Sequence, residues 1–144
     1  MSRLILSIFL LFLLSSCSKQ LRRPPSVLES YRQYQVLLQV KKELRKENLE
    51  LDKKEKLITF GEELAPKDSE LKLSKASLYK ARGDISNARS ALEEAVSLSP
   101  ANSLALSTYG EFLISNGHPE EGRNYCAYAM KLNPIDLLAR RCSR

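Results

Sequence analysis

The sequence predicts an all-α protein built as a stack of antiparallel helical hairpins. Three prolines, Pro66, Pro100 and Pro134, follow one another at a spacing of 34 residues, and Gly83 and Gly117 keep the same spacing. Similar residues recur beside each proline: leucine two positions before it (Leu64, Leu98, Leu132), a small residue five before it (Gly61, Ala95, Ala129) and an apolar residue eight before it (Ile58, Leu92, Cys126). Such a period is typical of proteins in which each hairpin buries its apolar side against the next hairpin.

Each recurring residue suits a defined place in a hairpin. Proline ends a helix because its ring and its missing N–H cannot continue one. Glycine lets the backbone turn between two helices, and a small residue lets a neighbouring helix approach closely. The 144 residues suffice for one small domain, and their 43% hydrophobic content with only five glycines and six prolines excludes collagen-like and glycine/proline-rich disordered proteins.

Residues 69–102 and 103–136 resemble the tetratricopeptide repeat (TPR). The residues that carry the resemblance in 69–102 are Ala76, Tyr79, Gly83, Asp84, Ala88, Leu92, Ala95 and Pro100. Those in 103–136 are Leu106, Tyr109, Gly110, Leu113, Gly117, Gly122, Cys126, Ala129 and Pro134, with Gly122 in the place of the usual alanine. The resemblance implies a TPR-like solenoid in which the first helix of each hairpin contributes to an inner, concave face.

The segments on either side of these two repeats match the pattern less well. Residues 27–68 are expected to form a degenerate N-terminal hairpin, although Lys54 stands where the pattern has alanine. The register that we favour for its first helix places five side chains on one face: Tyr34, Leu37, Leu38, Lys41 and Leu44. The alternative is one long helix over residues 26–64, because neither glycine nor proline interrupts residues 26–60. Residues 137–144 are expected to form a capping half-repeat over the last hairpin.

Residues 1–16 have the organisation of an export signal. Arg3 precedes an apolar run over residues 4–14, which at about 1.5 Å per residue is too short to span roughly 30 Å of hydrocarbon. The run ends in Leu14-Ser15-Ser16-Cys17, which resembles the lipobox of bacterial lipoproteins. The resemblance implies cleavage before Cys17, which then carries a diacylglycerol and a further acyl chain such as palmitate, and a lipidated tether over residues 17–26. An ordinary cleaved signal with a chance cysteine and an uncleaved signal anchor are the alternatives.

The same resemblance implies a cellular location. In Gram-negative lipoproteins a residue other than aspartate after the lipidated cysteine usually directs the protein to the outer membrane, and here that residue is Ser18. We therefore expect a protein that is lipid-anchored in the outer membrane of the cell envelope and faces the periplasm.

The net charge of +6 is distributed unevenly along the chain. Residues 17–60 contain 11 basic and 6 acidic side chains, whereas residues 61–144 contain 11 of each. We expect Lys19, Arg22 and Arg23 to contact anionic lipid headgroups, or else to belong to a solvated helix face. No nucleic-acid partner is expected, because aromatic residues are not interleaved with the basic ones.

The resemblance to TPR proteins places a partner-binding groove on the first helices of the two repeats. Its ligand-facing positions are Glu70, Leu73, Ser77, Lys80, Leu104, Ser107, Glu111 and Ile114. Leu73, Leu104 and Ile114 are apolar at positions that the packing of the repeats does not require, which favours a protein or peptide partner. The alternatives are that the N-terminal segment folds into this groove or that water alone covers it.

The sequence offers little to support an enzyme. The single histidine, His118, has no recognisable nucleophile or orienting acid, and no glycine-rich phosphate loop, zinc motif or paired CxxC occurs. We therefore expect no catalytic residue, no cofactor and no metal site. If Cys17 is lipidated and the compartment is oxidising, Cys126 and Cys142 are left to form a disulfide that would hold the capping helix. The alternative for Cys126 is a small buried core residue.

The function that these expectations favour is a lipid-anchored TPR adaptor of the bacterial envelope. The segment 109–113 has a weaker, local resemblance to type IV pilus pilotin lipoproteins, which implies assistance in assembling an envelope complex such as a pilus or a secretion system. A homo-oligomeric structural lipoprotein and a regulator of an envelope hydrolase are the alternatives.

Overall fold

The computed structural model describes residues 26–143, which form seven α-helices and no strand. The chain divides between Gln33 and Tyr34 into two units. The described part of the first unit is the start of helix α2 (Val27–Leu44), and the rest of α2 and the helices that follow belong to the second. Residues 1–25 lie outside the described part, and with them the predicted signal peptide, most of the tether and the lipidation site Cys17.

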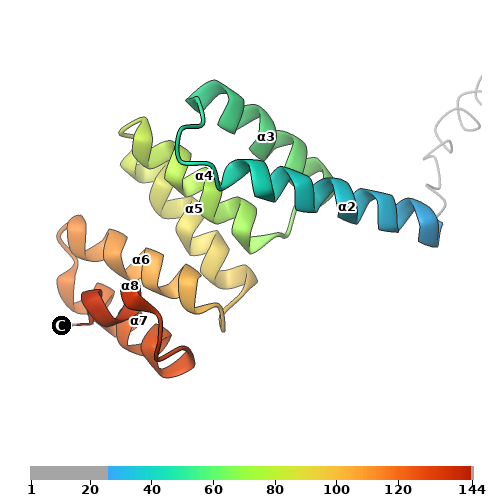
Figure 1. Cartoon of the computed structure of the whole chain (residues 1–144). Helices are drawn as coiled ribbons and strands as arrows, with labels where there is room; N and C mark the ends of the chain where they lie inside the picture. Colours follow the sequence, from blue (N-terminus) through green and yellow to red (C-terminus); the bar gives the residue numbers. More distant parts are fainter. Residues whose placement is uncertain (1–25, 144) are drawn as a thin grey trace, which may run out of the picture. The chain divides into compact units, whose positions relative to one another are not determined.

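Helices α3 to α8 have the bounds Leu51–Leu64, Ser69–Ala81, Ile85–Leu98, Ser103–Ser115, Pro119–Leu132 and Leu137–Cys142. Helix α4 packs on α5, and α6 packs on α7, as the antiparallel hairpins of residues 69–102 and 103–136 (Figure 1). Helix α8 packs on both α6 and α7, and α3 packs on α4. Residues 45–50 separate α2 from α3, so residues 27–64 form two helices and not one long helix. The predicted all-α stack of hairpins is confirmed.

The turns within the two hairpins form as the glycine spacing predicts. Gly83 and Gly117 have positive φ angles of 75° and 88°, a conformation that costs residues with a Cβ atom about 1–2 kcal/mol. In each turn the residue after the glycine donates its N–H back to a carbonyl of the last helical turn, Asp84 to Tyr79 and His118 to Leu113, both at 2.9 Å. Each glycine therefore reverses the chain and helps to satisfy a helix end.

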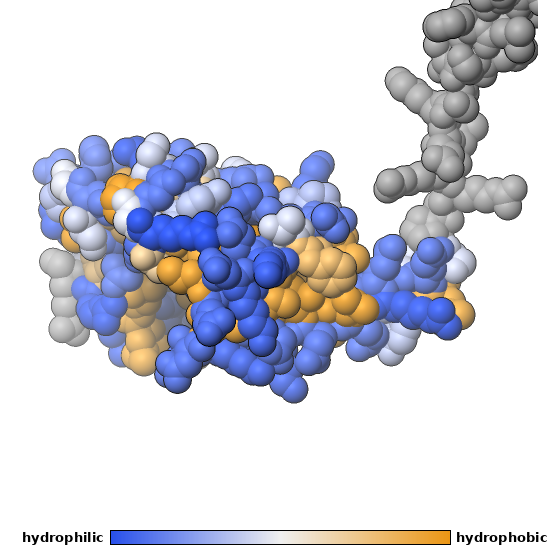
Figure 2. Space-filling view, turned by 90° about the horizontal axis from the view of Figure 1, so that it is seen from above, coloured by the Kyte–Doolittle hydropathy of each residue, from blue (hydrophilic) through white to orange (hydrophobic). Residues whose placement is uncertain are grey.

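The core lies between successive helices in three clusters of buried side chains. The central one joins the two hairpins: Ala76, Ala88, Ala91, Leu92, Tyr109, Phe112 and Leu113. The second lies where α2, α3 and α4 meet: Val40, Leu44, Ile58, Leu71 and Leu78. The third lies under α8: Leu106, Ala129 and Ala139. Figure 2 shows one face of the molecule, which is largely hydrophilic with hydrophobic residues gathered in separate patches.

The favoured register of α2 is wrong in part. Leu44 is buried and Leu37 is half-buried, as expected, but Tyr34 and Leu38 are exposed. Val40, which that register left out, is buried instead. Residues at spacings of three and four share a helix face, so the face that carries positions 37, 40, 41 and 44 is the one that packs, and Leu38 points away from it.

Candidate functional site

The eight predicted groove residues lie on α4 and α6, four on each helix at spacings of three or four. Ser77, Lys80 and Leu104 are exposed. Glu70, Leu73, Glu111 and Ile114 are half-buried, and Ser107 is fully buried. Other parts of the chain contact several of these residues, so the surface that remains open is smaller than the sequence predicts.

Glu70, at the start of α4, is held by two cations from the segment that precedes α3. Its carboxylate lies 2.7 Å from the Arg45 guanidinium and 3.1 Å from Lys41 Nζ. Burial of the Glu70 carboxyl acts to raise its pKa, but the hydrogen bonds from Arg45 and Lys41 outweigh it, so the pKa lies below its usual range. Charged side chains from α2 and the residue after it therefore cover the first groove position.

The middle of α4 faces a lysine from α3 and the central core. Lys54 Nζ donates a hydrogen bond of 2.9 Å to Ser77 Oγ, and burial lowers the pKa of Lys54 below its usual range. Leu73 is half-buried and packs against the central core cluster, so the packing of the repeats involves it, contrary to the prediction. Ser77 and Lys80 are thus the two predicted groove positions of α4 that are exposed to solvent.

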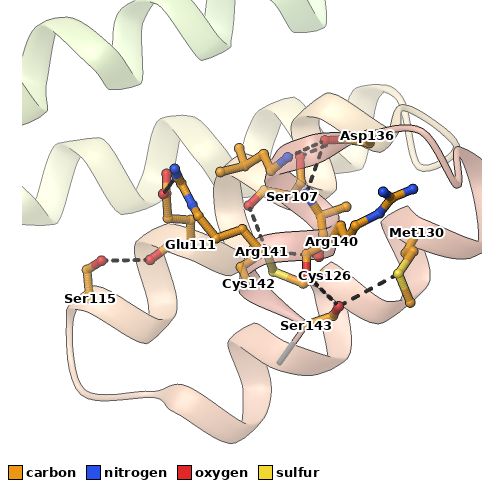
Figure 3. Close-up of a disulfide and its surroundings, with 12 residues drawn as sticks. Ser107, Glu111, Ser115, Cys126, Met130, Asp136, Arg140, Arg141, Cys142 and Ser143 are labelled. Carbon is orange, nitrogen blue, oxygen red and sulfur yellow. Dashed lines mark hydrogen bonds and ion pairs between the residues drawn. A yellow bond between two sulfur atoms is a disulfide. The ribbon is translucent and has the colours of Figure 1, made fainter.

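The second repeat is covered by the capping helix (Figure 3). Ser107 Oγ donates a hydrogen bond of 3.2 Å to Asp136 Oδ2, just before α8, and the Arg141 guanidinium on α8 forms an ion pair with Glu111. These contacts cover the central two of the four groove positions on α6. Leu104, at the start of α6, stays exposed.

Cys126 on α7 and Cys142 at the end of α8 form a disulfide with a Cα–Cα distance of 5.8 Å (Figure 3). This distance lies within the range that such a bridge requires. Cys126 is also fully buried. It is therefore both a partner in the disulfide and a small residue of the core. Beside the bridge lies a surface pocket of about 310 Å³, lined by Glu111, Ile114, Ser115, Arg123, Arg141 and Cys142.

Comparison with known proteins supports the repeat. The family model of the tetratricopeptide repeat matches residues 69–102. A search of curated proteins finds no match. Similar solved structures include a mutant O-GlcNAc transferase of Thermobaculum terrenum (22% identity, TM-score 0.64, 74% of this chain and 20% of that chain). The first TPR domain of Spaghetti (RPAP3), bound to the HSP90 peptide SRMEEVD, is similar over 76% of this chain and 94% of its own (22% identity, TM-score 0.63).

A further similar structure is that of a thermophilic TPR protein from Thermus thermophilus (20% identity, TM-score 0.56, 85% of this chain and 64% of that chain). The fold is a TPR solenoid. The chain spans 20% of the length of the transferase, and at these identities the likeness concerns the fold. TPR domains are generally protein-binding modules.

The polar groups inside this TPR solenoid pair with one another. Tyr109 donates a hydrogen bond of 2.8 Å to Glu93, which also pairs with Arg89, and burial together with this bond raises the pKa of Tyr109. His118 is exposed in the turn before α7. In the part of the chain that the structure describes, no group of three histidine, cysteine or acidic residues is placed to hold a metal ion. None of the helices there is long and apolar enough to cross a membrane.

One repeating feature of the TPR solenoid escaped the sequence analysis. Asp68, Asn102 and Asp136 each cap the helix that follows, and their side chains accept hydrogen bonds of 3.0–3.3 Å from two backbone N–H groups. They stand two residues after the three spaced prolines, again 34 apart. A proline followed two positions later by aspartate or asparagine could therefore have predicted where each of these helices begins.

Proposed function

We propose that this chain is a lipid-anchored TPR module that binds a protein or peptide segment in the bacterial cell envelope. The observation that carries the proposal is the open part of the first helices. Leu104 is an apolar side chain with 53% of its surface exposed, on the helix face to which the TPR resemblance assigns ligand contacts. Exposed apolar positions beside polar ones favour a helix or an extended peptide as the occupant.

Support for a peptide partner comes from the similar structures, since the first TPR domain of Spaghetti is bound to an HSP90 peptide. The partner of this chain is expected to differ from a peptide that ends in a clamped carboxylate, because the lysine and asparagine clamp of such domains is not evident here. Contacts through Leu104 and Lys80 would favour a segment that is apolar with an acidic residue nearby.

The envelope location is part of the proposal and comes from the resemblance of residues 14–17 to a bacterial lipobox. Acyl chains at the tether would hold the module at the outer membrane, facing the periplasm, where a membrane-bound partner meets it at high local concentration. Assistance in assembling an envelope complex, such as a pilus or a secretion system, is the role that we favour. Mass spectrometry of the mature N-terminus tests the anchor: Cys17→Ser should abolish a diacylglycerol adduct and leave the protein in the soluble fraction.

The binding face is tested by site-specific photo-crosslinking in cells. A photoreactive residue at position 104 is expected to capture a specific partner. The matched control is position 85, because Ile85 is apolar and 47% exposed but lies on α5, the second helix of its hairpin. Leu104→Glu should weaken binding of the captured partner. Equal capture at both positions, or none at 104, overturns this assignment of the face.

A second candidate function is self-association into a structural envelope protein. Leu132, Ile135 and Leu137 are all exposed around the turn from α7 to α8, and apolar residues close together on a surface are typical of interfaces. Sedimentation equilibrium of the protein and of an Ile135→Glu, Leu137→Glu variant separates the two candidates. A tight dimer that the double variant dissociates favours the structural role.

A further inference from the structure

We propose that the disulfide between Cys126 and Cys142 is a site of thiol–disulfide exchange with a dithiol, and that its reduction releases α8 from α6. The release would uncover Ser107 and Glu111, two positions of the predicted groove. The regulatory meaning rests on the proposed function, because it takes these positions as part of a binding surface. The chemical step and the release of the helix do not depend on it.

Apart from the disulfide, α8 is held by its packing on α6 and α7, by the hydrogen bond from Ser107 to Asp136 just before it, and by one ion pair. The helix has only six residues, and isolated helices shorter than about 12 residues are marginal in water. Its ion pair, Arg141 with Glu111, is exposed on the arginine side, and exposed pairs contribute little. Its apolar contact is through a small residue, Ala139, which packs on Leu106 and Ala129. The disulfide is therefore expected to contribute the largest part of the free energy that keeps α8 docked on α6 and α7.

The two sulfurs differ in access. Cys126 is fully buried between α6 and α7, whereas Cys142 is half-buried and lines the surface pocket of about 310 Å³. An incoming thiolate therefore reaches Cys142 Sγ first. Arg141 lies beside Cys142 (Figure 3) but forms an ion pair with Glu111, which lines the same pocket. Arg123 is a second exposed cation of that pocket and forms no ion pair within residues 26–143. Positive charge near the sulfur attracts a thiolate and stabilises the thiolate that leaves.

The exchange balances with a dithiol as reductant. One of its thiols loses a proton and attacks Cys142 Sγ, the disulfide bond breaks, and the electron pair and that proton go to Cys126 as a thiol. The second thiol then attacks the sulfur of the reagent in the mixed disulfide, closes the oxidised reagent into a ring and expels Cys142, which takes the second proton. Two electrons pass from the dithiol to the bridge, and two cysteine thiols result.

Release of α8 would change the surface of the second repeat. Ser107 would lose its hydrogen bond to Asp136, and Glu111 would lose Arg141. Leu106 and Ala129, both buried under Ala139, would become exposed beside them. The uncovered strip combines apolar and polar positions on α6 and α7, which suits an amphipathic helix that takes the place of α8.

Amide hydrogen exchange of the full-length protein in detergent micelles, with and without dithiothreitol, tests the release. Reduction is expected to speed exchange in α8 by about a hundredfold, the effect of losing a bridge that closes a loop of this length, with α4 and α5 unchanged. The Cys126→Ala, Cys142→Ala variant is the matched control and should exchange fast with or without the reagent. If α8 stays equally protected after complete reduction, or if the bridge is reduced only in denaturant, the proposal is overturned.

The entry site is tested by the rate of reduction. Arg123→Gln should lower the second-order rate constant of reduction by a dithiol by about threefold. The substitution removes a positive charge that attracts the incoming thiolate to Cys142 Sγ. Lys131→Gln removes the same charge from the other end of α7 and should leave the rate unchanged. Equal rates for the two variants overturn the assignment of the pocket. Neither test uses a partner, so a failed search for one would count against the proposed function alone.

Discussion

The two ends of this TPR solenoid hold their outermost helices by different chemistry. At the start of the second unit, α2 is held to α4 by ion pairs, with Lys41 Nζ 2.6 Å from Asp68 and 3.1 Å from Glu70. At the other end, α8 is held to α7 by a disulfide and to α6 by one hydrogen bond and one exposed ion pair. Both helices also bury apolar side chains in the core, Val40 and Leu44 on α2 and Ala139 on α8. In addition to this packing, charge holds the helix at one end and a covalent bond holds it at the other.

The difference predicts which condition acts on which end. Ion pairs between half-buried side chains weaken when salt screens them or when acid protonates the carboxylates. Neither salt nor acid breaks a disulfide, whereas thiols reduce it. Both devices cover groove positions, Glu70 at one end and Ser107 with Glu111 at the other, so the open surface between them is the part that no such contact covers.

Glycine packing should give the largest contrast between the two ends. A Cβ atom at Gly110 would lie 2.5 Å from Cys126 Sγ and 2.7 Å from the Gly122 carbonyl oxygen, and neither the bridge nor the backbone can move away easily. Gly110→Ala should therefore lower the free energy of unfolding by about 3 kcal/mol. At Gly61 the new atom meets the flexible end of Leu71 at 2.8 Å, and the gain in helix propensity, about 1 kcal/mol, offsets most of the strain.

Urea unfolding followed by circular dichroism measures both variants. The ratio of the two losses is the informative quantity, since both substitutions add one methyl group to a helix. If Gly61→Ala lowered the free energy of unfolding as much as Gly110→Ala, the packing of α6 on α7 would be no more rigid than that of α3 on α4. The contrast between the two ends would then be wrong.

Acid should act on the ion pairs around Lys72, a lysine that is only 8% exposed. Its Nζ lies 2.7 Å from Glu62 and 3.1 Å from Glu94, and Lys75 also pairs with Glu62. Burial acts to raise the pKa of Glu62, but hydrogen bonds from Lys72 and Lys75 outweigh it and bring the pKa below its ordinary 4.5. The stabilisation is therefore complete above pH 4.5 and is lost as the pH falls through the lower, folded-state pKa.

Glu62→Gln should accordingly cost about 1–2 kcal/mol at pH 7, because it leaves a largely buried ammonium with fewer partners. The matched control is Glu63→Gln, the neighbouring residue, which takes part in no ion pair within residues 26–143 and should have little effect. Unfolding measured across pH 3–7 should show the two curves of Glu62→Gln and the unchanged protein converge in acid. Parallel curves over the whole range would contradict this account.

The sequence predicted what depends on local spacing. The helical hairpins, the turns at Gly83 and Gly117 and the ends of the helices before the prolines follow from residue types at a period of 34. The N-cap residues Asp68 and Asn102 were readable by the same rule. The fold class therefore rested on signals that act within one or two turns of a helix.

What the sequence could not predict depends on contacts between distant residues. Ser107 is buried because α8 and the turn before it lie on it, and Glu70 is paired because Arg45 and Lys41, 25 and 29 positions away, reach it. Both were assigned to the open groove by their resemblance to ligand-facing positions of TPR proteins. The choice between Leu38 and Val40 as the buried residue of α2 likewise depends on where α3 and α4 pack, since both residues are apolar and lie on the same helix.

The smallest expected effect compares two arginines that are alike in exposure. The side chain of Arg141 is 72% exposed and pairs with Glu111, and that of Arg45 is 71% exposed and pairs with Glu70. Each substitution by glutamine should cost about 0.5 kcal/mol or less in global unfolding, because exposed ion pairs are well solvated. Arg45→Gln should cost the less of the two, since Lys41 remains bound to Glu70.

Reduction should separate the two arginine variants where global stability does not. In the oxidised protein the bridge holds α8 whether or not Arg141 is present, so Arg141→Gln should leave the amide exchange of α8 nearly unchanged. After dithiothreitol treatment the ion pair is one of two polar contacts described between α6 and the α8 segment, and Arg141→Gln should then speed exchange in α8 by about twofold. Arg45→Gln should have no effect there in either state. If Arg141→Gln changed the exchange rate of α8 equally before and after reduction, the disulfide would not be the main interaction that holds α8 on the repeat.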